Sequence, residues 1–336
     1  MLVVAVCAVC VAVGMVLLYV AGYRLPAVER EGYVYVPTGT SYQALLDSLG
    51  ADGGRVRNVA RFDRWARFEG VKKGVRPGRY HLTPRMGYRT VARMFRLGLQ
   101  TPVKVTFNHI RTMEQLAGVV ARQLEPDSAA MLAVLTADTA ASACGFTRQT
   151  FPAMFIPNTY EFYWTTSPAG FIRRMQREYE KFWNVARLEK LSNIGLTQIE
   201  AITLASIVYE ETKMSDEMPV VAGVYVNRLR IGMPLQADPT VKYAVGDFTL
   251  RRVLNRHLEV DSPYNTYMYA GLPPGPITMP SIRAIDAVLD YRPHKYLFFC
   301  AKPDFSGYHA FAVTLAEHNR NRDAYLRALN GLRIYR

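Results

Sequence analysis

The residues best suited to chemistry are two adjacent glutamates, Glu210 and Glu211, near the end of a predicted helix. The pattern Thr-Gln-Ile-Glu at 197–200 is a capping box, which predicts a helix over residues 198–212. On a period of 3.6 residues, Glu210 lies on a polar flank of this helix. Glu211 instead falls on the apolar stripe formed by Leu204, Ile207 and Val208.

The position of Glu211 suits a general acid. Burial on an apolar stripe disfavours the charged carboxylate, and the negative end of the helix dipole acts in the same direction. Both effects raise the pKa of a carboxyl, as general acid catalysis near neutral pH requires. Spacing alone leaves open the alternative, a solvated pair of glutamates at an exposed helix end.

Polar side chains follow in a loop between glycines and prolines. A second helix is predicted over 220–229, and residues 232–241 then carry Gln236, Asp238 and Thr240 in alternation. If this segment is extended, the three side chains point the same way, and their amide, carboxylate and hydroxyl groups suit sugar hydroxyls. A turn with its own side-chain bonds is an equally good interpretation of the pattern.

A second rigid loop cluster, over 262–277, is rich in Tyr, Pro and Gly and offers flat surfaces for carbohydrate rings. His309 lies in a predicted strand, where a structural role is commoner than a role as base. The sequence has no Gly-x-Ser-x-Gly elbow, no phosphate-binding glycine loop and no His-Glu-x-x-His. Its four cysteines lack metal-ligand spacing. We therefore expect acid/base chemistry by a carboxyl, with no metal and no cofactor.

The amino-acid composition excludes several classes of protein and favours one class of partner. Half of the 336 residues are hydrophobic, which excludes a disordered, collagenous or coiled-coil chain. Lys and Arg number 41 against 28 Asp and Glu, a net charge of +13 that favours an anionic partner such as nucleic acid, phospholipid or an acidic polymer. Four cysteines exclude a disulfide scaffold, and a bond between Cys144 and Cys300 is left open.

The chain begins with a candidate membrane span. Residues 2–23 carry no charge, and as a helix these 22 residues would be roughly 33 Å long, enough to cross the hydrocarbon core. A cleaved signal peptide is the alternative, but a basic start and a good cleavage site are missing. We expect an uncleaved anchor over 1–23, whose orientation the flanking charges do not decide.

The elements that must position these residues mix strands and helices, so the predicted fold class is α+β. Residues 33–82 predict a compact βααβ unit, with strands over 33–36 and 78–82 and helices over 41–49 and 58–68. A helix over 87–97, a strand over 103–107 and a helix over 112–124 follow. Further along, 127–150 is mainly helical, 155–164 is turn-rich, and one charged helix covers 171–190.

Four spaced motifs then give a resemblance. They are LASIVYEET at 204–212, NRLRIGMPLQADPTV at 227–241, YNTY at 264–267 and GLPPG at 271–275. In this order they closely resemble the YceG-like family of endolytic murein transglycosylases, over nearly the whole chain. The resemblance implies an inner-membrane anchor, a small LysM-like domain over 33–100, and a larger mixed α/β catalytic domain over 101–336 on the periplasmic side.

The resemblance also implies roles for residues. The family's catalytic glutamate ends a Glu-x-Glu-Thr motif and falls on Glu211, while Tyr209 replaces the first glutamate. The family often has Glu-Arg before the second helix, and here it is Glu217-Met218. We expect Glu210 and Glu217 to support Glu211. The glycan is expected to be held by Asn227, Gln236, Asp238, Thr240, Asn265 and Tyr267.

The implied reaction cuts murein strands internally. Glu211 protonates the oxygen between N-acetylmuramic acid and N-acetylglucosamine, then accepts the muramyl 6-hydroxyl proton as a 1,6-anhydro end forms. Such cuts limit the length of nascent strands, and peptidoglycan synthases of elongation or division are the expected partners. A non-catalytic peptidoglycan-binding scaffold is the alternative function. Because the basic residues are scattered and no recognition motif occurs, we expect no nucleic-acid partner.

Overall fold

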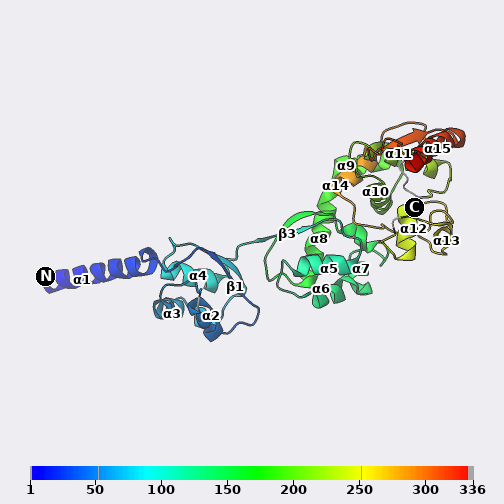
Figure 1. Ribbon diagram of the computed structural model, residues 1–336. Helices are drawn as coiled ribbons and strands as arrows, with labels where there is room; N and C mark the ends of the chain where they lie inside the picture. Colours follow the sequence, from blue (N-terminus) through cyan, green and yellow to red (C-terminus); the bar gives the residue numbers. More distant parts are fainter. Residues whose placement is uncertain (1, 52, 251, 332–336) are drawn as a thin grey trace. The chain divides into compact units, whose positions relative to one another are not determined.

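The computed structural model describes residues 2–51, 53–250 and 252–331 (Figure 1). The chain forms two compact units. Unit 1 comprises Met1–Val105, Ala121–Asp127 and Tyr160–Ser167, and unit 2 comprises Thr106–Val120, Ser128–Thr159 and Pro168–Arg336. The predicted boundary at residue 100 is near the end of the first segment. However, two short segments that the sequence analysis gave to the catalytic domain belong to unit 1.

Unit 1 begins with α1 (Leu2–Tyr19), which continues as a π-helical turn, η1 (Val20–Arg24). The stretch Val3–Arg24 has a mean hydropathy of 2.9, is long enough to cross a membrane, and is not covered by the rest of the structure. Helices of this length and composition near an N-terminus serve as membrane anchors or as signal sequences.

The predicted βααβ unit is confirmed. It consists of β1 (Gly32–Val36), α2 (Tyr42–Gly50), α3 (Val59–Phe68) and β2 (Gly78–Leu82), with a 3₁₀ turn, η2 (Val71–Lys73), before β2. The strands pair antiparallel, with Gly32 opposite Leu82. Side chains of Ser41 and Asn58 accept hydrogen bonds from the first turns of α2 and α3, as N-caps do. The core of this unit also takes in α4 (Tyr88–Leu97).

The middle of the chain departs from the prediction at two places. Its elements are β3 (Val103–Phe107), α5 (Met113–Ala121), α6 (Ser128–Leu135), α7 (Asp138–Ala143), η3 (Phe151–Met154), β4 (Asn158–Phe162), α8 (Pro168–Phe182) and α9 (Val185–Ile194). The turn-rich stretch contains the unpredicted strand β4, which pairs with β3. The single charged helix is wrong, because extended backbone at Asn184 ends α8 and its side chain caps α9.

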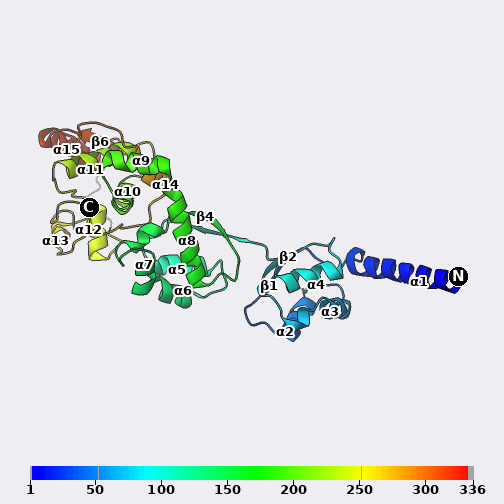
Figure 2. The same cartoon turned by 180° about the vertical axis from the view of Figure 1, so that it is seen from behind.

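The remaining elements surround α10 (Gln198–Glu211). They are α11 (Met218–Arg230), α12 (Asp238–Val245), α13 (Asn255–Leu258), α14 (Ile282–Leu289), β5 (Phe298–Ala301), β6 (His309–Ala312) and α15 (Leu315–Gly331). The predicted capping box at Thr197 makes both of its hydrogen bonds. Helix α10 packs against α11, α12 and α14, and both views show it between α11 and α12 (Figures 1 and 2). Its C-terminal residue, Glu211, is thereby held by the core of unit 2.

Candidate functional site

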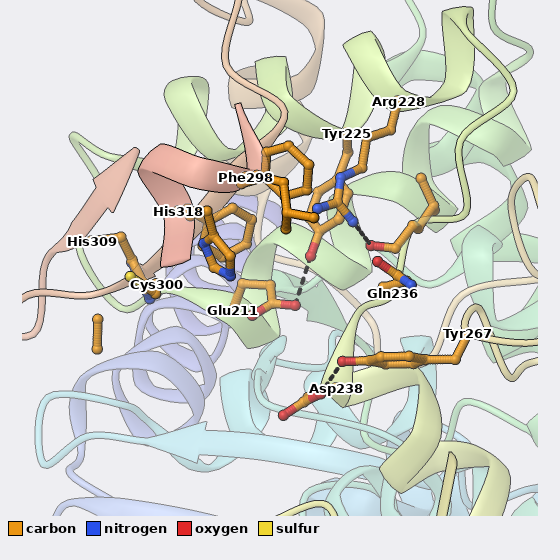
Figure 3. Close-up of a pocket in the computed structure, with 14 residues that line it drawn as sticks. Glu211, Tyr225, Arg228, Gln236, Asp238, Tyr267, Phe298, Cys300, His309 and His318 are labelled. Atoms are coloured by element: carbon orange, nitrogen blue, oxygen red, sulfur yellow. Dashed lines mark hydrogen bonds between the residues drawn. The ribbon is translucent and has the colours of Figure 1, made fainter. Parts of the chain in front are cut away.

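A pocket of about 370 Å³ opens at the C-terminal end of α10 (Figure 3). Its walls come from α10, α11, the loop before α12, the β5–β6 hairpin and the start of α15. Helices and strands therefore fix most of the lining, which favours precise geometry. The ionisable and amide side chains that line it are Glu211, Tyr225, Arg228, Gln236, Asp238, Tyr267, Cys300, His309 and His318.

Glu211 is the last residue of α10, and its carboxyl is half-buried in this pocket. The hydroxyl of the buried Tyr225 donates a hydrogen bond to Glu211 Oε1 at 2.7 Å. Burial raises the pKa of Glu211 to about 7; the charge of Asp238 adds to the rise, and the Tyr225 hydrogen bond opposes it. A carboxyl with such a pKa is populated in both protonation states near neutral pH, so it can donate a proton and then take one.

The Tyr225 hydrogen bond leads to a first prediction. Because it stabilises the carboxylate, Tyr225→Phe should raise the pKa of Glu211 further. We expect the ionisation midpoint of Glu211, followed by ¹³C NMR of labelled glutamate and assigned with Glu211→Gln, to move to higher pH. Tyr80→Phe also removes a buried hydroxyl, in unit 1, and should leave the midpoint in place. An unchanged midpoint in Tyr225→Phe would show that the Tyr225 hydrogen bond does not stabilise the Glu211 carboxylate.

A second carboxylate faces the pocket from the start of α12. Asp238 is the first residue of that helix, where the helix dipole favours negative charge. The hydroxyl of Tyr267 donates to Asp238 Oδ1 at 2.7 Å. Burial and the neighbouring Asp238 raise the pKa of Tyr267 well above its usual range, so this hydroxyl keeps its proton. Figure 3 shows Glu211 between this pair and the wall that contains Phe298 and His318.

A buried guanidinium contributes the positive charge of the pocket. Arg228 donates to the carbonyl oxygens of Leu297 and Leu235, both at 2.7 Å, and no carboxylate of the described residues pairs with it. It thereby links α11 to the residue that precedes β5 and to the loop before α12. Its charge favours the ionised form of Glu211 and so limits the rise in that pKa. Arg228 thus both holds the site together and tunes its acid.

Gln236 lines the pocket and has a backbone conformation that few residues other than glycine adopt. Its φ is +48°, and its backbone nitrogen donates a hydrogen bond to the Thr266 carbonyl at 3.0 Å. For a residue other than Gly, this left-handed conformation costs roughly 1–2 kcal/mol. Strain of this kind is retained where the side chain has a use. We infer that the fold specifies the backbone conformation from which the Gln236 side chain enters the pocket.

This strain can be measured. Gln236→Gly should unfold with a free energy about 1 kcal/mol higher than Gln236→Ala, because Gly adopts positive φ without penalty. Urea unfolding of the two variants gives the comparison. The same pair of substitutions at Gln198, which lies in α10, should show the reverse order, since Gly weakens a helix. Equal stabilities at position 236 would mean that the strain is absent.

The structure brings Gln236, Asp238 and Tyr267 together with Glu211, but not the other predicted binding residues. Asn265 is fully buried, and its Nδ2 donates to the carbonyls of Leu258 and Val260. Asn227 likewise donates to backbone carbonyls near the start of β5. These amides hold loops in place, so their hydrogen-bonding capacity is used within the protein.

Thr240 is also buried, and its hydroxyl bonds to Thr266 and to the Ala237 carbonyl. Of the two interpretations left open by the sequence, the extended segment that carries Gln236, Asp238 and Thr240 on one side does not occur, because α12 begins at Asp238. On a helix, residues two apart point roughly 200° away from each other. Thr240 therefore faces the core where Asp238 faces the pocket.

The two supporting glutamates lie in different places. Glu217 is buried and accepts hydrogen bonds from the backbone nitrogen and Nδ1 of His309, both at 2.7 Å, and from Thr212 Oγ1 at 3.0 Å. It thus connects the segment after Glu211 to β6, and it fixes the ring of His309 at the pocket wall. Glu210 instead pairs with Arg111 at 2.7 Å in a neighbouring cleft.

Sequence reasoning assigned no role to Tyr225 or Arg228, and for His318, as for His309, it favoured a structural role. One signal was available for the first two, since they lie three residues apart in an apolar helix and so share a face. Burial lowers the pKa of His318, so this ring favours its neutral form. Cys144 and Cys300 are both free thiols. Within the described residues, no three His, Cys, Asp or Glu side chains form a group that could hold a metal ion.

Comparisons with known proteins show similarity to one family. The model of the YceG-like family matches residues 34–324. The endolytic murein transglycosylase of Bacillus subtilis is 28% identical over 316 residues, which are 88% of this chain and 85% of that protein. The enzyme of the same name from Streptococcus pneumoniae is 31% identical over 169 residues, 49% of this chain but only 30% of that protein. The crystal structure of a yceG-like protein from Listeria monocytogenes superposes with a TM-score of 0.56 at 25% identity, covering 87% of this chain and 99% of that one.

Proposed function

The chain belongs to the YceG-like family, and we propose that it is an endolytic murein transglycosylase in which Glu211 is both acid and base. The observation that carries this assignment is the half-buried carboxyl with a pKa of about 7 at the centre of the pocket. One group with that pKa serves both proton transfers of a lyase, whereas a hydrolase also needs a placed water.

The reaction begins with protonated Glu211, which donates its proton to the oxygen between N-acetylmuramic acid and N-acetylglucosamine. The bond from the anomeric carbon to this oxygen breaks and positive charge develops on the sugar ring. Asp238, whose carboxyl is oriented by the Tyr267 hydroxyl, stabilises that charge from the other side of the pocket. The muramyl 6-hydroxyl then attacks the anomeric carbon and passes its proton to the Glu211 carboxylate. The products are a 1,6-anhydro end and a free 4-hydroxyl.

The polar groups that remain exposed in the pocket bind the glycan. Gln236 provides a side-chain amide, and Asp238 and Tyr267 provide oxygen atoms, for hydrogen bonds with sugar hydroxyls. Phe298 supplies an aromatic surface of the kind on which sugar rings pack. The pocket volume of about 370 Å³ lies within the range of sites that bind small ligands or a few units of a polymer.

The N-terminal helix indicates where in the cell the protein acts. We propose that Val3–Arg24 is an uncleaved single-pass anchor in the cytoplasmic membrane, with both units on the extracytoplasmic side where murein lies. The βααβ unit resembles a LysM-like domain in its order of elements, and we assign glycan contact to it. An enzyme placed there meets nascent strands, so peptidoglycan synthases are its expected neighbours.

Mass spectrometry of reaction products tests this function. The full-length protein in detergent, incubated with purified uncrosslinked glycan strands, should produce internal cuts that end in 1,6-anhydromuramic acid. Reducing ends in their place would mean a hydrolase and would require an activated water. Intact strands that still bind the protein would favour the non-catalytic scaffold.

A further inference from the structure

A second, smaller cleft adjoins the pocket, and none of its side chains donates or accepts a proton in the mechanism proposed above. It shares the last turn of α10 and the first turn of α12 with the pocket: Glu210 precedes Glu211, and Pro239 follows Asp238. Lys242, one turn further along α12, completes this edge of the cleft. The same two helix ends therefore hold a reacting carboxyl on one side and a basic cleft beside it.

The charges in this cleft do not cancel. Arg111 pairs with Glu210 at 2.7 Å, and its guanidinium lies 5.3 Å from the ring centre of Phe248. Lys242 is half-buried, yet its ammonium makes no hydrogen bond or ion pair with any residue that the structure describes. A half-buried ammonium has lost part of its hydration, and an anionic or carbonyl partner compensates for that loss. One cation of the cleft is thus available to a ligand.

The size of the cleft limits that ligand. Its volume is about 70 Å³, against about 370 Å³ for the pocket. Since one bound water requires roughly 10–15 Å³ of cavity volume, the cleft can hold a carboxylate or a few waters but is too small for a sugar ring. Pro239, Phe248 and Ile277 form apolar walls beside the two cations. Such a mixture suits a carboxylate carried on a short aliphatic stem, as in a peptide.

We propose that the cleft between Arg111 and Lys242 binds a carboxylate of the murein stem peptide while the glycan lies in the pocket. This inference rests on the proposed function. In intact murein the lactyl carboxyl of N-acetylmuramic acid is consumed in the amide bond to the peptide, so the anionic groups beside the glycan belong to the stem. The enzyme would then read the peptide as well as the sugar backbone at the cut.

The test compares two substrates that differ only in charge. Amino groups of purified strands are first acetylated, and half of the material is then coupled to ammonia with a carbodiimide, which converts its carboxylates to amides. For the wild-type chain, we expect kcat/KM to be about fivefold to tenfold higher on the carboxylate strands, the effect of one partly exposed charge-assisted hydrogen bond. Lys242→Gln should bring this ratio close to one, and Lys242→Arg should retain it.

The ratio isolates the stem contact. Lys242 also favours ionised Glu211, and that effect acts on both substrates alike and cancels. Lys295→Gln removes an exposed lysine that lines neither cavity and should keep the wild-type ratio. A wild-type ratio of one, or a wild-type ratio in Lys242→Gln, would overturn the inference.

Binding separates this inference from the proposed function. In a Glu211→Gln background, the affinity for the two kinds of strand can be measured by co-sedimentation without cleavage. A preference for carboxylate strands that disappears with Lys242→Gln supports the cleft even if the wild type cuts neither substrate, in which case only the lyase assignment fails. Equal affinity for both kinds of strand refutes the stem-peptide site.

Discussion

Glu211→Gln should lower the rate of strand cleavage by about 10³-fold, within the range for removing a general acid and base. Gln has the shape of Glu and can still accept the Tyr225 hydrogen bond, so the loss reflects proton transfer and not a rearranged pocket. In the wild type, kcat/KM should fall as pH rises through about 7, because the protonated acid is then depleted. Anhydromuramic ends counted by mass spectrometry give both results.

The same variant should be more stable at high pH. Folding raises the pKa of Glu211 from 4.5 to about 7, so the folded state favours the protonated side chain. Its contribution to the unfolding free energy is therefore complete below pH 4.5 and is lost as the pH rises through 7. At pH 8, Glu211→Gln should exceed the wild type by up to about 3 kcal/mol in unfolding free energy, and at pH 4 the two should match. Glu189→Gln, at an exposed position, should change neither rate nor stability. Full activity in Glu211→Gln would assign the chemistry to another residue.

Glu217→Ala should produce the largest loss of stability. It leaves the backbone nitrogen of His309, the His309 ring and the Thr212 hydroxyl without their buried acceptor. Breaking a buried pair by removing one partner costs roughly 3–5 kcal/mol. Urea unfolding should show this loss through a lower midpoint at an unchanged slope.

A matched exposed glutamate provides the control for that loss. Glu189→Ala should lie within about 0.5 kcal/mol of the wild type, as surface substitutions do. A decrease of less than 1 kcal/mol in Glu217→Ala would show that the network around His309 contributes little. The segment between Glu211 and α11 would then have to be held by other contacts.

The local parts of this structure were predictable because their signals are local. Ser41, Asn58 and Thr197 cap helices in the structure as their sequence patterns indicate. The stripe on α10 identified Glu211 as the unusual carboxyl, and its raised pKa agrees with that argument. In each case, the determining residues lie within one or two helical turns of each other.

The binding residues were harder to predict, since residue type does not show which amides are used within the protein. The carbonyls that accept from Asn227 come from residues 294 and 296, far along the chain. Those that accept from Asn265 lie five and seven residues before it, in a loop whose conformation has no regular period. The start of α12 was missed although Asp238-Pro239 is a common beginning of a helix. The contact between Glu217 and His309 joins residues 92 positions apart, which spacing within one element cannot reveal.

The discontinuity of unit 1 in the sequence has a consequence for folding during synthesis. Glu125 accepts hydrogen bonds from Thr38, its backbone nitrogen bonds to the Trp164 carbonyl, and Gln100 bonds to Thr165, all within this unit. A growing chain cannot complete these contacts until residue 165 has been synthesised, about halfway through translation. We expect the first segment of unit 1 to remain incompletely packed until that point, so that unit 1 closes only after about half of the chain has been made.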